Sequence, residues 1–256
     1  MRAVSSALLF AGLCVIAPSA HASISFAGSG GQGTNGNVLT FCQTGVPPCG
    51  SGVFTVLASA WSNTGGGGVL ATADLGQYNP FGLGVCNASE LAASGGCQPP
   101  QHAIDDSGHL DFVLLTFSQP VQSITLTLSP FNTINDPMDA TYIVGDCKPS
   151  PTSCSPGGKT VTMLSAMSGF STVSVTGLNS GNPAHDITLT LNLAGTGTSG
   201  VNWVLIGANI SETNNYFKLE GMTYSATPEP ATFGLAGAAL LGLGLLRARK
   251  KRSPSS

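Results

Sequence analysis

The chain has 256 residues, of which 42% are hydrophobic and only 8% are charged. Between residues 23 and 226 there are eleven acidic side chains but only three basic ones, Lys148, Lys159 and Lys218, so this stretch has a formal charge of −8. Clustered Lys and Arg are needed to bind phosphate backbones, and this balance therefore argues against nucleic-acid binding. It is compatible with divalent cations or neutral sugars as ligands.

The first 22 residues have the three regions of a secretory signal peptide. Arg2 supplies a positive start, residues 3–16 form a short apolar stretch, and the segment ends in Ala20-His21-Ala22. Small residues in this A-x-A arrangement are typical of a signal-peptidase site. We therefore expect an exported protein that is cleaved after Ala22, with Ala20 and Ala22 as the recognised residues. The mature domain is then residues 23–226.

Six cysteines remain after the signal peptide, and an even number in an exported chain indicates disulfides. They form three close pairs, Cys42 with Cys49, Cys86 with Cys97, and Cys147 with Cys154. Each pair flanks a loop rich in Pro or Gly, which favours local pairing, although the sequence leaves other connectivities open. No two cysteines have the spacing of a zinc knuckle, so crosslinks are expected rather than a metal site.

The mature domain has the residue pattern of β-strands. Residues 122–129 and 186–193 alternate apolar and hydroxyl side chains, as half-buried strands do, and 110–117 is a continuous apolar run typical of a strand covered on both faces. In chain order, strands are expected at residues 53–61, 69–73, 110–117, 122–129, 140–145, 159–164, 171–176, 186–193, 201–210 and 217–224.

Between these strands the sequence predicts turns and little helix. Gln119-Pro120 and Gly181-Asn182-Pro183 are typical of turns, residues 88–93 fit one helical turn, and residues 27–37 and 65–68 are expected to be mobile Gly-rich loops. Many short strands with hydroxyl-rich faces indicate an all-β fold of two packed antiparallel sheets. We therefore predict a jelly-roll-like β-sandwich, preceded by the signal peptide and followed by one membrane-sorting helix.

The C-terminus has three parts in a fixed order. Pro228-Glu229-Pro230 precedes an apolar run at 233–246, and a basic cluster follows at 247–252. A helix of fourteen residues is about 21 Å long, shorter than the roughly 30 Å hydrocarbon core of a bilayer. We expect transient insertion in the inner membrane, with the basic cluster on the cytoplasmic side. The prolines keep the preceding backbone extended, as a processing enzyme requires. An ordinary tail anchor is the alternative.

This pattern, over residues 227–252, resembles the PEP-CTERM sorting domain. The resemblance implies a Gram-negative bacterium that makes extracellular polysaccharide, and processing by an exosortase-type membrane enzyme. It implies that Pro228, Glu229 and Pro230 are the sorting motif, that 233–246 is the span and that 247–252 is the stop signal. It also implies an inner-membrane-held precursor, followed by a position at the cell surface or in the extracellular matrix. Residues 111–117, 139–146 and 203–208 more loosely resemble β-sandwich domains that precede such signals.

Candidate catalytic and metal-binding residues are few. His102 with Asp105, or His109 with Asp111, could be written into a Ser–His–Asp scheme, whereas His185 opens an expected strand and is expected to be solvated. The sequence has no G-x-S-x-G elbow, and we expect no catalytic residues. Asp105-Asp106 and the loop at 135–139 offer oxygen ligands of the kind that Ca²⁺ prefers. Asp is also a common turn residue, so no metal site and no cofactor are expected.

Sugar binding requires exposed aromatic rings. Trp61 and Trp203 fall in expected strands, where core packing is the usual outcome, whereas Tyr78 and Phe81 flank Asn79-Pro80 in an expected loop. We therefore expect a non-enzymatic structural or interaction protein of the cell surface or matrix. An exopolysaccharide-binding module is the first alternative, and a secreted hydrolase is the second.

Overall fold

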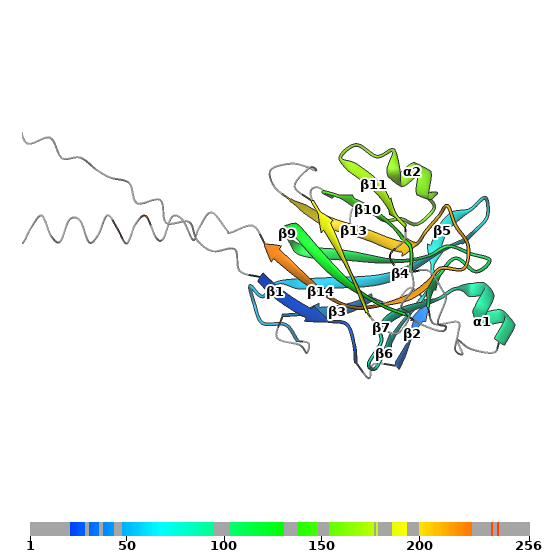
Figure 1. Ribbon diagram of the computed structural model, residues 1–256, viewed down its shortest axis with the longest axis horizontal. Helices are drawn as coiled ribbons and strands as arrows, with labels where there is room; N and C mark the ends of the chain where they lie inside the picture. Colours follow the sequence, from blue (N-terminus) through cyan, green and yellow to red (C-terminus); the bar gives the residue numbers. More distant parts are fainter. Residues whose placement is uncertain are drawn as a thin grey trace, which may run out of the picture.

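One 20-residue strand, β9 (Asp111–Pro130), pairs with four other strands and connects two parts of an antiparallel sheet (Figure 1). This computed structural model describes residues 21–28, 31–35, 38–43, 48–94, 103–130, 138–147, 154–176, 178, 186–193, 200–226, 237 and 240. Every strand pairing among them is antiparallel. The predicted all-β, antiparallel class is confirmed.

The two halves of β9 have different neighbours. The first half pairs with β4 (Thr55–Gly65) on one side and β13 (Val201–Ala208) on the other. The second half pairs with β12 (Ile187–Asn192) and β14 (Tyr216–Ala226). Because one strand passes through both parts, the position of each part depends on the other.

The remaining strands extend these two parts. The part around the first half of β9 continues through β3 (Val38–Cys42), β5 (Val69–Thr72), β10 (Ala140–Gly145) and β11 (Phe170–Val175). The other part continues from β14 through β1 (His21–Ser25), β2 (Gly31–Asn35), β6 (Asp74–Tyr78), β7 (Gly82–Cys86) and β8 (Ile104–Asp105).

Burial along β9 follows the two sequence patterns. In the apolar first half, Val113 and Leu115 enter the main core, while Phe112 and Leu114 enter a second cluster on the opposite face. In the alternating second half, Ile124, Leu126 and Leu128 are buried in the main core and the residues between them are not. The predicted coverage on both faces of 110–117 and on one face of 122–129 is therefore confirmed.

The predicted turn at Gln119-Pro120 is wrong, because β9 continues through it. The pairing with β13 shifts its register there, from Thr116 opposite Trp203 to Val121 opposite Val201. A bulge of this kind tolerates proline, because the residue at the irregularity does not need a ladder N–H. The two predicted strands are consequently one bulged strand.

Two further local predictions are corrected and one is confirmed. The strand expected at 159–164 is instead helix α2 (Val161–Ser165), because the Thr160 side chain accepts a hydrogen bond from the Met163 N–H and caps the first turn.

The Gly-rich segment at residues 27–37, which was expected to be a loop, contains β2, whose backbone pairs with β6. The expected helical turn at 88–93 is confirmed as α1 (Ala88–Ser94).

The glycines at 65–68 connect β4 to β5, as predicted. Gly67 and Gly68 have φ values of 78° and 75°, which favour glycine because it has no Cβ. The Gly68 N–H donates to the Gly65 carbonyl and closes the turn (3.0 Å).

Two disulfides of the predicted local pairing are present, Cys42–Cys49 and Cys147–Cys154, each with a Cα–Cα distance of 5.8 Å. Cys86 is also disulfide-bonded, and Cys97 lies outside the described residues.

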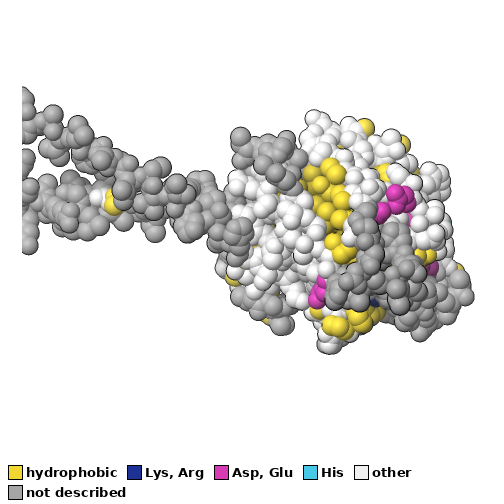
Figure 2. Space-filling view, in the orientation of Figure 1, with side chains coloured by type: hydrophobic (Ala, Val, Ile, Leu, Met, Phe, Trp, Pro, Cys, Tyr) yellow, Lys and Arg dark blue, Asp and Glu magenta, His cyan; other side chains and the backbone are white. Residues whose placement is uncertain are grey.

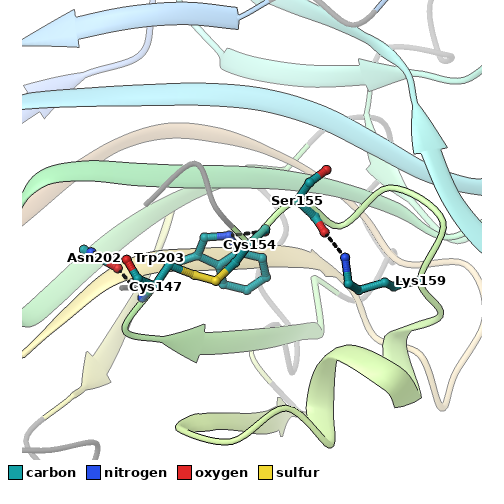
Figure 3. The surroundings of a disulfide bond; sticks show 6 residues. All are labelled: Cys147, Cys154, Ser155, Lys159, Asn202 and Trp203. Carbon is teal, nitrogen blue, oxygen red and sulfur yellow. Dashed lines mark hydrogen bonds between the residues drawn. A yellow bond between two sulfur atoms is a disulfide. The ribbon is translucent and has the colours of Figure 1, made fainter. Parts of the chain in front are cut away.

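The Cys147–Cys154 disulfide lies beside the second cluster (Figure 3). This outer cluster consists of Leu70, Phe112, Leu114, Ile143, Cys147, Leu164, Trp203 and Leu205. The Trp203 indole N–H donates to the Cys154 carbonyl (3.0 Å). Asn202 exchanges two hydrogen bonds with the Cys147 backbone, accepting from its N–H at 2.7 Å and donating to its carbonyl at 3.2 Å. The disulfide thus holds together two backbone positions, Cys147 and Cys154, that bind Asn202 and the buried Trp203.

The two disulfides provide a matched test of this role, because both join cysteines seven residues apart. Loop-closure entropy therefore contributes equally to both, about 2.5 kcal/mol each. Cys147→Ser/Cys154→Ser should reduce the unfolding free energy by more than Cys42→Ser/Cys49→Ser, because it also loosens the contacts to Trp203 and Asn202. Urea denaturation of the exported protein measures both losses. Equal losses would contradict the additional role.

Candidate functional site

The predicted sorting signal begins immediately after the last strand. β14 ends at Ala226, and Pro228, Glu229, Pro230 and the basic cluster at 247–252 lie outside the described residues. Of the predicted span, only Gly237 and Leu240 are described. Within the part of the chain that the structure describes, no helix has the length and apolar character to cross a membrane.

The two ends of the described domain lie side by side. β1 pairs antiparallel with β14, which places His21 opposite Ser225 and Ala22 opposite Tyr224 (Figure 1). Ala20, the other residue of the predicted signal-peptidase site, lies outside the described residues. The predicted N-terminal cleavage site is therefore adjacent to the point where the chain leaves the domain towards the sorting signal.

Of the three candidate histidines, His102 and His185 lie outside the described residues. His109 Nε2 is 3.1 Å from Ser89 Oγ at the exposed end of helix α1. Among the described residues, no carboxylate is hydrogen-bonded to His109, so the structure brings together only two members of a triad there.

The four candidate aromatic residues occupy different environments. Trp203 is fully buried, as expected for a strand residue. Trp61 is half-buried and lines a shallow, mainly apolar pocket together with Val38, Leu57, Leu114 and Pro156. Phe81 is 47% exposed, whereas Tyr78 is half-buried with its ring centroid 3.9 Å from the Lys218 ammonium. Trp61 and Phe81 are thus available to a ligand, and Trp203 is not.

The two Asp-containing segments meet at Asn215. The Asn215 backbone N–H donates to Asp106 Oδ1 (3.0 Å), and its side-chain amide donates to Asp106 Oδ2 (2.8 Å). The Asn215 side-chain oxygen accepts a hydrogen bond from the Asp139 N–H (3.1 Å). Asp106 therefore has a structural role, while its neighbour Asp105 is buried elsewhere.

Asp105 belongs to a group of three carboxyl groups, with Glu90 and Asp111, that we call the carboxylate cluster. One oxygen from each lies within 4.8 Å of the others. Asp105 is the last residue of β8, Asp111 is the first residue of β9, and Glu90 lies in the first turn of α1. Only the pairing of distant segments brings these residues together.

A reciprocal cap holds Glu90 in position. The Asn87 side-chain oxygen accepts hydrogen bonds from the N–H groups of Ser89 (3.0 Å) and Glu90 (3.2 Å), and the Asn87 N–H donates to Glu90 Oε2 (2.9 Å). This is the arrangement of a capping box, in which the third helical residue turns back to the start of the helix.

Burial makes the charged form of the cluster costly. Asp105 is 2% exposed and Asp111 is fully buried. Burial raises the pKa of Asp105 to about 8, and the charges of Glu90 and Asp106 add to the rise. Burial, followed by the charges of Asp105 and Glu90, raises the pKa of Asp111 well above its ordinary value. Asp105 was predicted from the sequence as a possible oxygen ligand, whereas Glu90 and Asp111 were not. The Asn87-x-x-Glu90 spacing was the available signal for a fixed Glu90.

Charged side chains are sparse on the described surface. On the face drawn in Figure 2, acidic side chains appear as isolated patches, and most of the described surface is uncharged. This agrees with the low charge content of the sequence, 8% of all residues.

A model of the PEP-CTERM protein-sorting motif matches residues 226–250. This chain carries a PEP-CTERM sorting signal. The motif marks an exported protein that is transiently anchored in the membrane and processed by an exosortase. No curated protein and no solved structure matches the chain. The match to the PEP-CTERM motif therefore identifies the processing route and leaves the activity of the β domain to be inferred from its residues.

Lys218, on β14, is a buried basic residue. It is 2% exposed, and burial lowers its pKa to about 7. An unfolded lysine keeps its proton up to about pH 10.4. Between these pH values the unfolded state binds more protons than the folded state, so stability should rise with pH. Below pH 7 the lysine is charged in both the folded and the unfolded state, so the full free-energy cost of burying its charge reduces the stability of the fold.

Lys218→Met should remove this pH dependence while preserving the length of the side chain. The variant should have a larger unfolding free energy than the wild type at pH 6.5. This advantage should be smaller at pH 9.5, by on the order of 2 kcal/mol. Urea denaturation at both pH values measures the difference. Lys159→Met is the control, because the Lys159 ammonium donates to the Ser155 carbonyl at an exposed position (Figure 3). If the difference in unfolding free energy between Lys218→Met and the wild type is the same at both pH values, the free-energy cost assigned to the buried ammonium is contradicted.

Proposed function

We propose that this protein is a non-enzymatic structural or interaction component of the bacterial cell surface or extracellular matrix. Its signal peptide, residues 1–22, directs export, and the span at 233–246 holds the precursor in the inner membrane. An exosortase-type enzyme then recognises Pro228-Glu229-Pro230 and separates the β domain from its tail. The match at residues 226–250 is the observation that carries this proposal.

The arrangement of the domain supports this route. Because β1 and β14 are paired, the predicted signal-peptidase site and the start of the sorting signal lie at the same end of the domain. A precursor attached to the membrane through either terminus therefore presents the same end of the domain to the bilayer. Cleavage after Ala22 removes two residues of β1 and leaves Ser23–Ser25 paired with β14.

We further infer that the β domain is a sandwich. Residues from both halves of β9 contribute to one main core, with Val113, Leu115 and Phe117 from the first half and Ile124 and Leu126 from the second. Two sheet parts that share one strand and bury side chains against a common core fit the layers of a β-sandwich.

The sorting motif is tested by changing Pro228-Glu229-Pro230 to Ala-Ala-Ala. Export should remain intact, but an uncleaved precursor should accumulate in the inner membrane because the processing enzyme has lost its recognition sequence. Immunoblots of membrane fractions and mass spectrometry of the mature chain from the native host measure the outcome.

Two controls sharpen this experiment. Changing Ser253-Pro254-Ser255 to Ala-Ala-Ala alters an equal number of residues beyond the basic cluster and should leave processing unchanged. Deleting 247–252 should let some precursor pass through the membrane unprocessed. Normal maturation of the triple-alanine variant, or a native protein that still contains 233–246, would replace the sorting interpretation with a plain tail anchor.

Exopolysaccharide binding is the second candidate function, and the environment of Trp61 favours it. The half-buried indole lines an apolar pocket and its N–H donates to Ser59 Oγ (3.0 Å), which fixes the orientation of the ring. A fixed aromatic ring at a surface pocket is suited to stacking against a sugar.

Retention of the exported protein on purified exopolysaccharide from its host tests this candidate. Trp61→Ala should reduce retention at least tenfold, a loss of about 1.4 kcal/mol in binding free energy. Phe81→Ala is the control, since it removes an exposed ring outside the pocket. Loss of binding in Phe81→Ala alone would place the ligand at that loop instead, and no retention of the wild type would exclude this function.

A further inference from the structure

The geometry of the carboxylate cluster matches the first coordination shell of a large divalent cation. Oxygen ligands of Ca²⁺ lie 2.3–2.6 Å from the ion, so two ligands on opposite sides are separated by about 5 Å at most. One oxygen from each of Glu90, Asp105 and Asp111 lies within 4.8 Å of the other two. An ion placed among them reaches all three without movement of the backbone.

Asp105 and Asp111 have no cationic counterpart among the described residues. The groups that shift the pKa values of Asp105 and Asp111 are carboxyl groups, an amide, a hydroxyl and a backbone N–H, and none is a cationic side chain of the described residues. Lys218 lies over the Tyr78 ring, and Lys159 is bonded to Ser155. Buried carboxylates are normally paired or bound to a metal, because an isolated buried charge is costly.

Ser62 supplies an independent observation. It is the direct cross-strand partner of Asp111 in the β4–β9 pairing, and both residues are fully buried. The Ser62 hydroxyl is close enough to influence Asp111, yet Ser62 Oγ makes no hydrogen bond of normal geometry. A buried hydroxyl without a partner is rare in folded proteins. A cation in the cluster would give this oxygen a partner.

We propose that Glu90, Asp105, Asp111 and Ser62 form a Ca²⁺-binding site. The donors are all hard oxygens, and carboxylates can bind Ca²⁺ through one or both oxygens to reach its coordination number of 6–8. Zn²⁺ is disfavoured because it prefers nitrogen and sulfur ligands. Mg²⁺ is disfavoured because it demands a strict octahedron and retains several waters.

The bound ion joins parts of the chain that are distant in sequence. It connects helix α1 through Glu90 to the end of β8, the start of β9 and the middle of β4. Removal of the ion leaves buried carboxyl groups that favour their protonated form, and the link between these segments is lost. Calcium should therefore stabilise the folded domain, in the manner of any ligand that binds only the native state.

Isothermal titration calorimetry and thermal unfolding of the full exported protein, stripped with EGTA, test the site with CaCl₂ and MgCl₂ as probes. Calcium should bind with a stoichiometry of one and, at a concentration well above its Kd, raise Tm by on the order of 5 °C. Magnesium at the same concentration should produce a much smaller rise. Absence of calcium binding would overturn the proposal, and equal effects of the two ions would overturn the choice of Ca²⁺.

Variants separate this site from non-specific binding. Asp111→Asn should abolish the calcium-dependent rise in Tm, and the apo variant should remain folded because the amide has the shape of the carboxyl group and places no charge in the interior. Glu90→Gln, at the half-buried edge of the cluster, should weaken calcium binding at least tenfold. Glu220→Gln, which alters a carboxyl group coupled to Asp186 outside the cluster, should bind calcium like the wild type. Wild-type calcium affinity in both Asp111→Asn and Glu90→Gln would contradict the assignment.

Discussion

The burial of both faces of β9 in its first half is the constraint on which the rest of the fold depends. A strand covered on both sides needs one layer beneath it and another above, and the chain supplies the main core on one face and the outer cluster on the other. Trp203, on the neighbouring strand, fills the outer cluster, and α2 with the Cys147–Cys154 disulfide covers it. Because β9 continues into the second part of the sheet, the same strand also determines where β14 and β12 lie.

The sparse charges of this protein are unevenly distributed between surface and interior. In a chain with only 8% charged residues, Asp105, Asp111 and Lys218 are nevertheless almost completely buried. Burial is the largest cause that raises the pKa of the two acids and lowers that of the lysine, since each charged form is poorly solvated inside the domain. Such groups reduce stability unless they have a partner. For the carboxylate cluster, the proposed Ca²⁺ would balance the charge of the carboxylates and give the Ser62 hydroxyl a partner.

The pairing of β1 with β14 connects the fold to the processing of the chain. These strands place both ends of the described domain together, with the last strand ending one residue inside the region that matches the sorting motif.

The sequence by itself determined the features that depend on neighbouring residues. Alternation and apolar runs specified strand type along β9, seven-residue separations favoured the described disulfide pairs, and the order of Pro-Glu-Pro, apolar run and basic cluster identified the sorting signal. Short-range errors arose where two patterns compete, as at Thr160, whose side chain caps a helix in a segment that alternates like a strand. Only the tertiary structure decided that Gln119-Pro120 is a bulge within one strand and that Glu90, Asp105 and Asp111 meet. The reason is that strand pairing between distant segments follows from the burial of whole faces, and no local pattern encodes which faces will meet.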